Sequence, residues 1–190
     1  GSTTNHCSPP DPQPGYAGTL KCYGLKMQKL TEAEYRTLAD FIYRECQLAD
    51  EGRWDEWEEL LADDMHYWVP VNPDDADPDR DVSIINDNRS RLATRLRQLR
   101  TGTRHSQSPR SVMRRMISNL VAERLDQQMF RVEGNFVVYE FQNQSTGTLN
   151  VWPGRVRYHL RQVDDSFEIA LKRVELVMAG APLPSLAFII

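Results

Sequence analysis

Apolar and polar residues recur with a helical period soon after the start of the chain. Between Thr31 and Gly52 the apolar side chains stand three or four residues apart, the spacing of one buried helix face: Tyr35, Leu38, Ala39, Ile42, Tyr43, Cys46 and Ala49. Thr31 and Glu34 have the spacing of a capping box, and Gly52 suits a left-handed helix end. We therefore predict a helix between these two signals, with Cys46 in the core.

Shorter elements are predicted in the next fifty residues. Helical spacing of Trp54, Trp57, Leu60 and Leu61 indicates a short second helix that ends at an acidic pair, Asp63 and Asp64. Residues 65–69 are strand formers, and Pro70 ends that strand. A solvated, aspartate-rich loop follows over residues 72–80. Leucines spaced through residues 88–100 then predict a third helix, capped by Asp87 or Asn86 and stopped near Gly102.

The second half of the chain has the pattern of long β-strands. Stretches with strand-like composition are separated by turn residues, including a hairpin turn at Asp164–Asp165; they cover residues 111–125, 128–143, 148–163 and 167–178. Helices followed by a run of strands predict an α+β fold in which the helices pack on one face of a curved antiparallel sheet. Residues 1–29 are rich in proline and glycine and are predicted to be an extended arm, so that residues 30–190 form the domain.

Composition excludes several classes of protein. The chain has 190 residues, of which 40% are hydrophobic, which is enough for one core without disulfides or metals. Its apolar runs are too short to span a bilayer, and a net charge of -4 with an isoelectric point near 5.6 argues against binding nucleic acid. The three cysteines are an odd number with no close pair in the sequence, which favours a reducing compartment. We therefore expect a cytoplasmic protein with no membrane contact.

Charge is distributed unevenly along the chain. Residues 51–81 contain twelve acidic residues and two arginines, whereas residues 88–115 contain nine arginines and no acidic residue. Guanidinium groups form bidentate ion pairs with carboxylates and tolerate partial burial. The arginine-rich segment therefore suits contacts with a protein partner, although a solvated helix face explains the pattern equally well.

Motifs that bind cofactors or supply nucleophiles are not found. The histidines and cysteines lack the spacing of a Rieske cluster or a zinc site, and no phosphate-binding or nucleophile-elbow motif occurs. We expect no cofactor, metal or catalytic residue in this chain. The best acid/base candidates are Asp63, Asp64 and His66, in which a carboxylate could orient the imidazole, but a structural role is the favoured interpretation.

Five residues are candidates for a partner interface. Strand alternation sets Trp68 on the face opposite Tyr67, toward a pocket or a partner. Arg110, Arg114 and Arg115 stand among apolar residues at strand spacing without the aromatic residues of a nucleic-acid surface. The apolar ending that contains Phe188 is expected to dock on its own sheet or on a neighbouring chain.

Three ordered blocks of residues resemble the small subunit of the Rieske-type aromatic-ring-hydroxylating dioxygenases. The first runs from Trp54 and Trp57 through Ala62-Asp63-Asp64 to Tyr67-Trp68-Val69-Pro70. The second runs from Asp87-Asn88 through Leu99-Arg100-Thr101-Gly102 and Ser108-Pro109-Arg110-Ser111 to Arg114-Arg115-Met116-Ile117-Ser118-Asn119. The third contains Val132-Glu133-Gly134-Asn135-Phe136, Gly154-Arg155-Val156 and Lys172-Arg173-Val174.

This resemblance implies a cone-shaped fold like that of nuclear transport factor 2 and a non-catalytic, structural role. In such enzymes a catalytic large subunit carries the Rieske [2Fe-2S] cluster and a mononuclear iron, and the small subunit forms a trimer within a hexamer of three large and three small subunits. The ending of the chain is similar to the branch that acts on benzoate-type or salicylate-type acids. The alternative is a free-standing isomerase or dehydratase with its pocket inside the cone, for which Asp64 and His66 would be the reacting groups.

Overall fold

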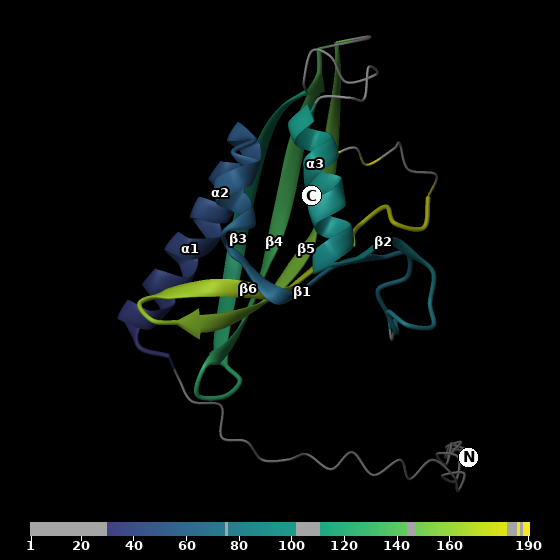
Figure 1. Ribbon diagram of the computed structural model, residues 1–190. Helices are drawn as coiled ribbons and strands as arrows, with labels where there is room; N and C mark the ends of the chain where they lie inside the picture. The colour runs from purple at the N-terminus through teal and green to yellow at the C-terminus, as the bar shows by residue number, and fades with distance from the viewer. Residues whose placement is uncertain (1–29, 75, 102–110, 144–146, 182–185, 187) are drawn as a thin grey trace, which may run out of the picture.

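The protein folds as a strongly curved sheet with three helices on its concave side (Figure 1). The computed structural model describes residues 30–74, 76–101, 111–143, 147–181, 186 and 188–190. The predicted arm and Arg110 lie outside these residues. The elements of the described part are α1 (Glu32–Glu51), α2 (Trp54–Glu58), β1 (Leu61–Pro70), β2 (Ser83–Asn88), α3 (Arg89–Thr101), β3 (Val112–Arg124), β4 (Met129–Gln142), β5 (Thr148–Val163) and β6 (Ser166–Leu176).

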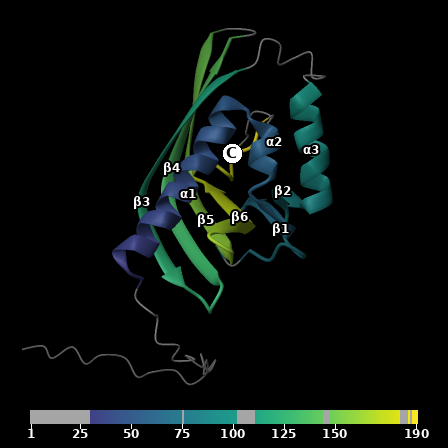
Figure 2. The same ribbon diagram turned by 60° about the vertical axis from the view of Figure 1, so that its left-hand side comes forward.

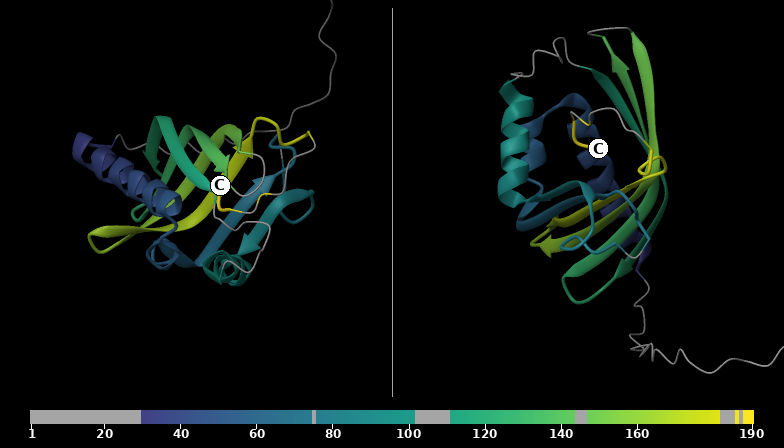
Figure 3. Two further views of the ribbon diagram at one scale, coloured as in Figure 1. Left: turned by 90° about the horizontal axis from the view of Figure 1, so that it is seen from above. Right: turned by 90° about the vertical axis from the view of Figure 1, so that its right-hand side faces the viewer.

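The sheet has the strand order β2-β1-β6-β5-β4-β3. Neighbouring strands are antiparallel except for β1 and β6, which run parallel, so the prediction of an antiparallel sheet is wrong for this one pair. After β1 the chain forms β2, α3 and the long strands β3, β4 and β5. The last strand, β6, then takes the place between β5 and β1, where it runs parallel to β1. The long strands curl around the helices, and the last residues lie inside the resulting cone (Figures 2 and 3).

Helix α1 begins and ends as its sequence predicts. The Thr31 hydroxyl accepts a hydrogen bond from the Glu34 amide at 3.2 Å, the Glu34 carboxylate accepts one from the Thr31 amide at 2.7 Å, and Gly52 has a left-handed φ of 65°. Of the predicted apolar face, Leu38, Ala39, Ile42 and Ala49 are buried, Tyr35 and Cys46 are half-buried, and Tyr43 is 50% exposed. Glu45, which was not predicted to face the core, is fully buried.

Three predictions around β1 and α3 are wrong, and one strand was missed. The strand begins at Leu61 rather than at residue 65, and α2 already ends at Glu58, because Leu61 pairs with Ile169 and the Leu60 carbonyl accepts the Ile169 amide at 2.8 Å. The strand β2 was not predicted, since its polar residues resemble a loop. Asn88, rather than Asp87 or Asn86, caps α3 by accepting a hydrogen bond from the Arg91 amide at 3.0 Å.

The four long strand predictions are confirmed to within a few residues at each end, and β5 has the predicted bounds. The turn at Asp164 is also confirmed by its φ of 50°. Alternate residues of these strands point into the cone and form the core with α1 and β1. The largest fully buried side chains include Trp57, Tyr67, Phe130, Trp152 and Tyr158.

The uneven charge distribution is largely balanced by contacts within the chain. Glu58 of α2 accepts from Arg89 at 2.6 Å, and Asp55 pairs with Arg100 at 2.7 Å, so α3 is tied to α2. Asp87 of β2 pairs with Arg95 at 2.7 Å. Much of the arginine-rich segment therefore holds its own helix in place. None of the helices in the described part of the chain is both long and apolar enough to cross a membrane.

Candidate functional site

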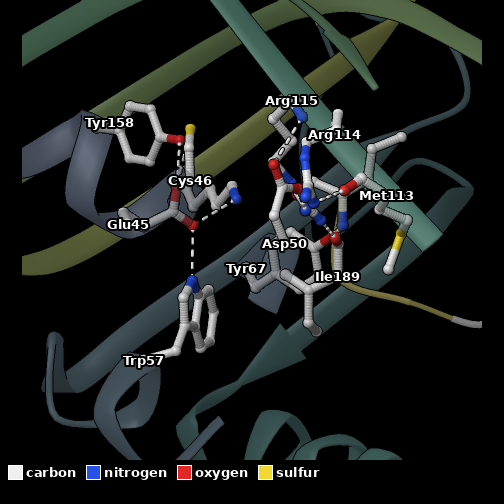
Figure 4. A network of polar contacts seen from close by, with 12 residues as sticks. Glu45, Cys46, Asp50, Trp57, Tyr67, Met113, Arg114, Arg115, Tyr158 and Ile189 are labelled. Carbon is white, nitrogen blue, oxygen red and sulfur yellow. Dashed lines mark hydrogen bonds and ion pairs between the residues drawn. The ribbon is translucent and has the colours of Figure 1, made fainter. Parts of the chain in front are cut away.

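The cone interior contains a buried polar network centred on Glu45 (Figure 4). One carboxylate oxygen accepts hydrogen bonds from the Trp57 indole and the Lys172 ammonium, each at 2.8 Å. The other accepts from the Tyr158 hydroxyl at 3.1 Å. These groups come from α1, α2, β5 and β6, so the network joins the helical layer to the sheet.

Burial and the neighbouring cation act in opposite directions on the carboxyl of Glu45. Burial disfavours the charged form, but the Lys172 ammonium and its hydrogen bond, together with the Arg115 charge and the Trp57 hydrogen bond, outweigh this effect, so that the pKa of Glu45 lies below its ordinary value of 4.5. Both members of the ion pair are almost completely buried. A buried pair of this kind is stabilising only while both partners are charged and hydrogen-bonded.

A second buried ion pair lies beside the first. The Asp50 carboxylate at the end of α1 pairs with the Arg115 guanidinium of β3 and accepts the Arg115 amide at 2.8 Å. The same guanidinium donates to the carbonyl of Ile189. The Tyr67 hydroxyl accepts from the Ile190 amide at 3.0 Å and donates to the Ile190 carbonyl at 3.2 Å. The segment Phe188–Ile190 is thereby fixed inside the cone.

Between these networks the structure leaves a cavity of only about 10 Å³, lined by Cys46, Arg115, Tyr158, Lys172 and Ile190 among others. A space of this size holds at most one water molecule. Burial raises the pKa of the Cys46 thiol to about 12, and the nearby Glu45 carboxylate adds to this rise, so the thiol is a poor nucleophile at neutral pH. The polar groups here stabilise the fold, and the space is too small for a substrate of several atoms.

The predicted acid/base group is not assembled. Asp64 is exposed and forms a two-pronged ion pair with Arg161, at 2.7 and 2.9 Å, and this contact lowers the pKa of its carboxyl. His66 instead contacts the side-chain oxygen of Asn86 at 2.8 Å. The alternation of β1 places His66 on the face opposite Met65 and Tyr67, away from the cone interior. Within the described residues, no group of three or more possible metal ligands is found.

Most of the predicted interface residues are buried within the chain itself. Trp68 stacks on His66, lies under the Arg173 guanidinium and donates to the Ser83 hydroxyl at 2.9 Å. Phe188 packs edge-on against Trp152 with ring centroids 5.8 Å apart. Arg115 is the buried partner of Asp50, whereas its neighbour Arg114 is exposed on the outer face of the sheet.

Sequence reasoning missed Glu45, Lys172 and Asp50. The position of Glu45 carried a signal, because it stands three residues after Ile42 and four before Ala49 on the apolar face of α1. Lys172 likewise occupies an inward position of β6, between Ile169 and Val174. An isolated charge at a core position is a sign of a buried partner, but nothing in the sequence indicates which residue that partner is.

Comparisons with known proteins agree with this arrangement. The family model described as the ring hydroxylating beta subunit matches residues 44–180. The small oxygenase component of the p-cumate 2,3-dioxygenase system of Pseudomonas putida is 30% identical over 136 residues, covering 70% of this chain and 74% of the relative. The beta subunit of an N,N-dimethyl phenylurea N-demethylase of Sphingobium sp. (strain YBL2) is 29% identical over 175 residues, covering 86% of this chain and 98% of the relative.

A solved structure extends the match to the fold. The beta subunit of the benzoate 1,2-dioxygenase of Burkholderia mallei superimposes with a TM-score of 0.67 at 25% identity, covering 86% of this chain and all of that chain. The expected cone fold is confirmed by this likeness. The three sequence blocks, the curved sheet and the matched family model lead to one conclusion: the chain belongs to the family of small (beta) subunits of the aromatic-ring-hydroxylating oxygenases.

Proposed function

We propose that this chain is the structural subunit on which a larger, catalytic oxygenase subunit is assembled. The observation that carries this proposal is the engagement of Glu45, Lys172 and Tyr158 with one another around a space of about 10 Å³. Inward-facing polar groups that bond each other hold the sheet and helices together and leave no room there for a substrate. In this proposal the Rieske [2Fe-2S] cluster and the mononuclear iron belong to the larger partner, as does the reaction with oxygen.

The proposed assembly is a hexamer of three large and three small subunits. The relatives are named as small components or beta subunits of their oxygenases, which supports a partner of another kind. Among the predicted interface residues that the structure describes, Arg114 is exposed and can contact a partner directly. Three other candidates are packed within the chain: Trp68, Arg115 and Phe188. In the proposed assembly they hold in place the residues that form the contact surface.

The substrate class proposed for the whole enzyme is an aromatic acid of the benzoate or salicylate type. Support comes from the named substrates of two matched proteins, p-cumate and benzoate. The N-demethylase relative acts on a different kind of compound. In this proposal the small subunit does not select the substrate, because its interior contributes no substrate-sized space at the Glu45 network.

Mild affinity purification of the full chain from its source cells, followed by native mass spectrometry and iron analysis, tests the proposal. We expect a complex with a larger, iron-containing chain in roughly equal amount. The matched control is the same purification from cells that express the chain without the tag. Recovery of the chain alone, in several independent purifications, contradicts the proposal. Turnover of a small ketone or hydroxy-aromatic compound by that isolated chain would support the dehydratase or isomerase alternative.

A further inference from the structure

A groove of about 510 Å³ lies where the second half of α1 meets the edge strand β3. Its apolar lining consists of Tyr43 on α1 and of Met116 and Ile117 on β3, and Tyr43 and Met116 are both at least half exposed. Sites for small molecules have volumes of about 300–1,000 Å³ and apolar walls with a few polar groups. The groove therefore has the size and the kind of wall that a small ligand requires.

The polar lining of the groove contains two arginines, and the first of them carries an unbalanced charge. Arg114 is exposed, and no carboxylate in the described part of the chain lies within ion-pair distance of its guanidinium. Glu51 also lines the groove, but its carboxylate already accepts hydrogen bonds from Gln47 and Arg53, which lower its pKa. The Arg114 guanidinium is consequently available to an anion from outside the chain.

The second arginine of the groove, Arg115, has an unused hydrogen-bond donor. Its side chain is only 4% exposed, and its terminal nitrogens bind the Asp50 carboxylate and the Ile189 carbonyl (Figure 4). Among the residues that the structure describes, its buried Nε finds no acceptor. Buried donors without an acceptor are rare in folded proteins, because they lose their contact with water and gain nothing in return. An oxygen atom supplied by a ligand would satisfy this donor.

The charges of the groove favour an anionic ligand. Asp50 neutralises Arg115, and Arg53 neutralises Glu51, so that the charge of Arg114 is left over. A carboxylate matches the guanidinium fork, since its two oxygens can accept two parallel hydrogen bonds. A carboxylate in this groove can also accept a hydrogen bond from the free Nε of Arg115.

The apolar walls favour an aromatic body on that ligand. The Tyr43 ring can stack with a second ring, and the Met116 sulfur makes favourable contacts with aromatic groups. The one thiol in the lining, that of Cys46, is a poor nucleophile because its pKa is raised to about 12. The groove is therefore suited to holding such a ligand rather than to transforming it.

We propose that the groove between α1 and β3 is a binding site for a small aromatic carboxylate. Arg114 holds the carboxylate, the Nε of Arg115 donates to it, and Tyr43 and Met116 cover the ring. The inference goes beyond the assembly role, because it follows from the groove alone and applies to the chain before any partner binds. A bound acid would contact α1 and the edge strand together, and would thus stabilise the folded chain.

Isothermal titration calorimetry of the purified full chain tests the charge of the ligand, with 4-isopropylbenzoate as the probe. We expect saturable binding at one site, and binding at least about tenfold weaker for the uncharged 4-isopropylbenzamide, which has the same shape. Arg114→Gln should weaken the binding of the acid about tenfold to a hundredfold, because it removes charge-assisted hydrogen bonds. Arg97→Gln is the matched control, since Arg97 is an exposed arginine outside the groove; its affinity should equal that of the wild type.

Two further measurements test the aromatic wall and the buried donor. Tyr43→Ala should weaken the binding of the acid about threefold to tenfold, because the ring loses its stacking partner. In proton–nitrogen spectra of the full chain, the Nε–H signal of Arg115 should shift when the acid is added, whereas that of Arg97 should not. Circular dichroism checks that the variants are folded.

Several outcomes would overturn the proposal. These are the absence of saturable binding, equal affinity for the acid and the amide, unchanged affinity in Arg114→Gln, or an Arg115 Nε signal that does not move. If no acid binds and Arg114→Gln loses a larger iron-containing chain on purification, Arg114 contacts that chain instead, and the proposed function stands without this inference. If the acid binds but no larger chain is recovered, the proposed function is contradicted and the binding site remains.

Discussion

The buried Lys172 ammonium decides whether Glu45 can remain charged inside the cone. Replacement by methionine keeps most of the side-chain volume and removes the charge, so that burial then raises the pKa of Glu45. We expect Lys172→Met to lose about 3–5 kcal/mol of unfolding free energy at pH 7. The loss should be smaller at pH 5, because protonation neutralises the unpaired carboxylate. Urea unfolding at both pH values measures the difference.

The double variant Glu45→Gln with Lys172→Met is the control for that experiment. It removes both charges and keeps hydrogen-bonding groups for Trp57 and Tyr158. Its loss should be smaller than that of Lys172→Met and should not depend on pH between 5 and 7. In the wild type, the lowered pKa of Glu45 stabilises the fold above its ordinary value of 4.5, and this contribution is lost as the pH falls through the lower, folded-state value. If the loss of unfolding free energy in Lys172→Met does not depend on pH, this account is contradicted.

Cys46 should be unreactive in the folded protein. Its side chain is half-buried, its thiol lies 3.6 Å from a Glu45 carboxylate oxygen, and burial raises its pKa to about 12. Iodoacetamide at pH 8 should therefore leave Cys46 unmodified in the native chain and label it fully after unfolding in urea. Peptide mass spectrometry separates this residue from Cys7 and Cys22. Rapid labelling of the native protein would show that the interior opens on the timescale of the reaction.

Single residues were predictable where a local rule determines them. The cap at Thr31, the helix end at Gly52 and the contact of the half-buried Cys46 with the core each follow from a pattern within a few positions. The Glu45–Lys172 pair joins residues 127 positions apart, and it depends on a parallel strand contact that no local pattern indicates. Its discovery required the structure.

Helix α1 is fixed to the edge of the sheet by one contact near each of its ends. Asp50 binds both the amide and the guanidinium of Arg115, and Tyr35 donates to the Leu120 carbonyl at 3.1 Å. These contacts occupy backbone groups of β3 that an edge strand otherwise presents to other chains. The helix therefore protects this edge as well as covering the core.

Removal of the Asp50 carboxylate should loosen this contact. Asp50→Ala leaves Arg115 buried without its anion, and we expect a loss of about 3–5 kcal/mol in the free energy of unfolding. Asp40→Ala on the exposed side of the same helix should change stability by less than about 0.5 kcal/mol. Guanidinium unfolding of both variants makes the comparison. Equal, small losses would mean that solvent already reaches Arg115.

Elements were predictable in proportion to their length and regularity. The long strands β3 to β6 alternate over ten or more residues, and their bounds follow from composition and turns. The start of β1 was wrong because Leu60 and Leu61 continue the helical spacing of Trp54 and Trp57, while pairing with β6 draws them into the sheet. The short strand β2 is defined by its neighbour β1 rather than by its own residues.

The whole molecule depends on the segment Phe188–Ile190 to fill the cone. Phe188→Ala should cost about 3–5 kcal/mol, since it leaves a void against Trp152. Val121→Ala, on the exposed outer face, should cost less than about 0.5 kcal/mol. Thermal unfolding monitored by circular dichroism measures both. A small effect of Phe188→Ala would show that the segment contributes little to the core.

The α+β architecture was predictable from helices followed by long strands, and the resemblance of three sequence blocks added the cone shape. Neither source predicted the parallel pairing of β1 with β6, because that contact depends on how the whole chain returns to its centre. The same reason explains why the sequence left the acid/base alternative open for Asp64 and His66, which the structure holds in separate contacts with Arg161 and Asn86. The strand face was predictable, but which face lines the cone was not.

Lys172 and Ile190, which complete polar contacts inside the cone, lie late in the chain, and this affects how the protein folds during synthesis. Glu45 and Tyr67 lie 127 and 123 residues before Lys172 and Ile190, which complete their hydrogen bonds. At a ribosomal rate of about 5–20 residues per second, this separation corresponds to roughly 6–25 s of synthesis. During that time Glu45 on the first helix lacks the cation that it pairs with in the finished fold, although the earlier strands are already available to cover part of the helix. The carboxylate therefore stays in contact with water until β6 has been made, and the closing of the cone interior is one of the last steps of folding.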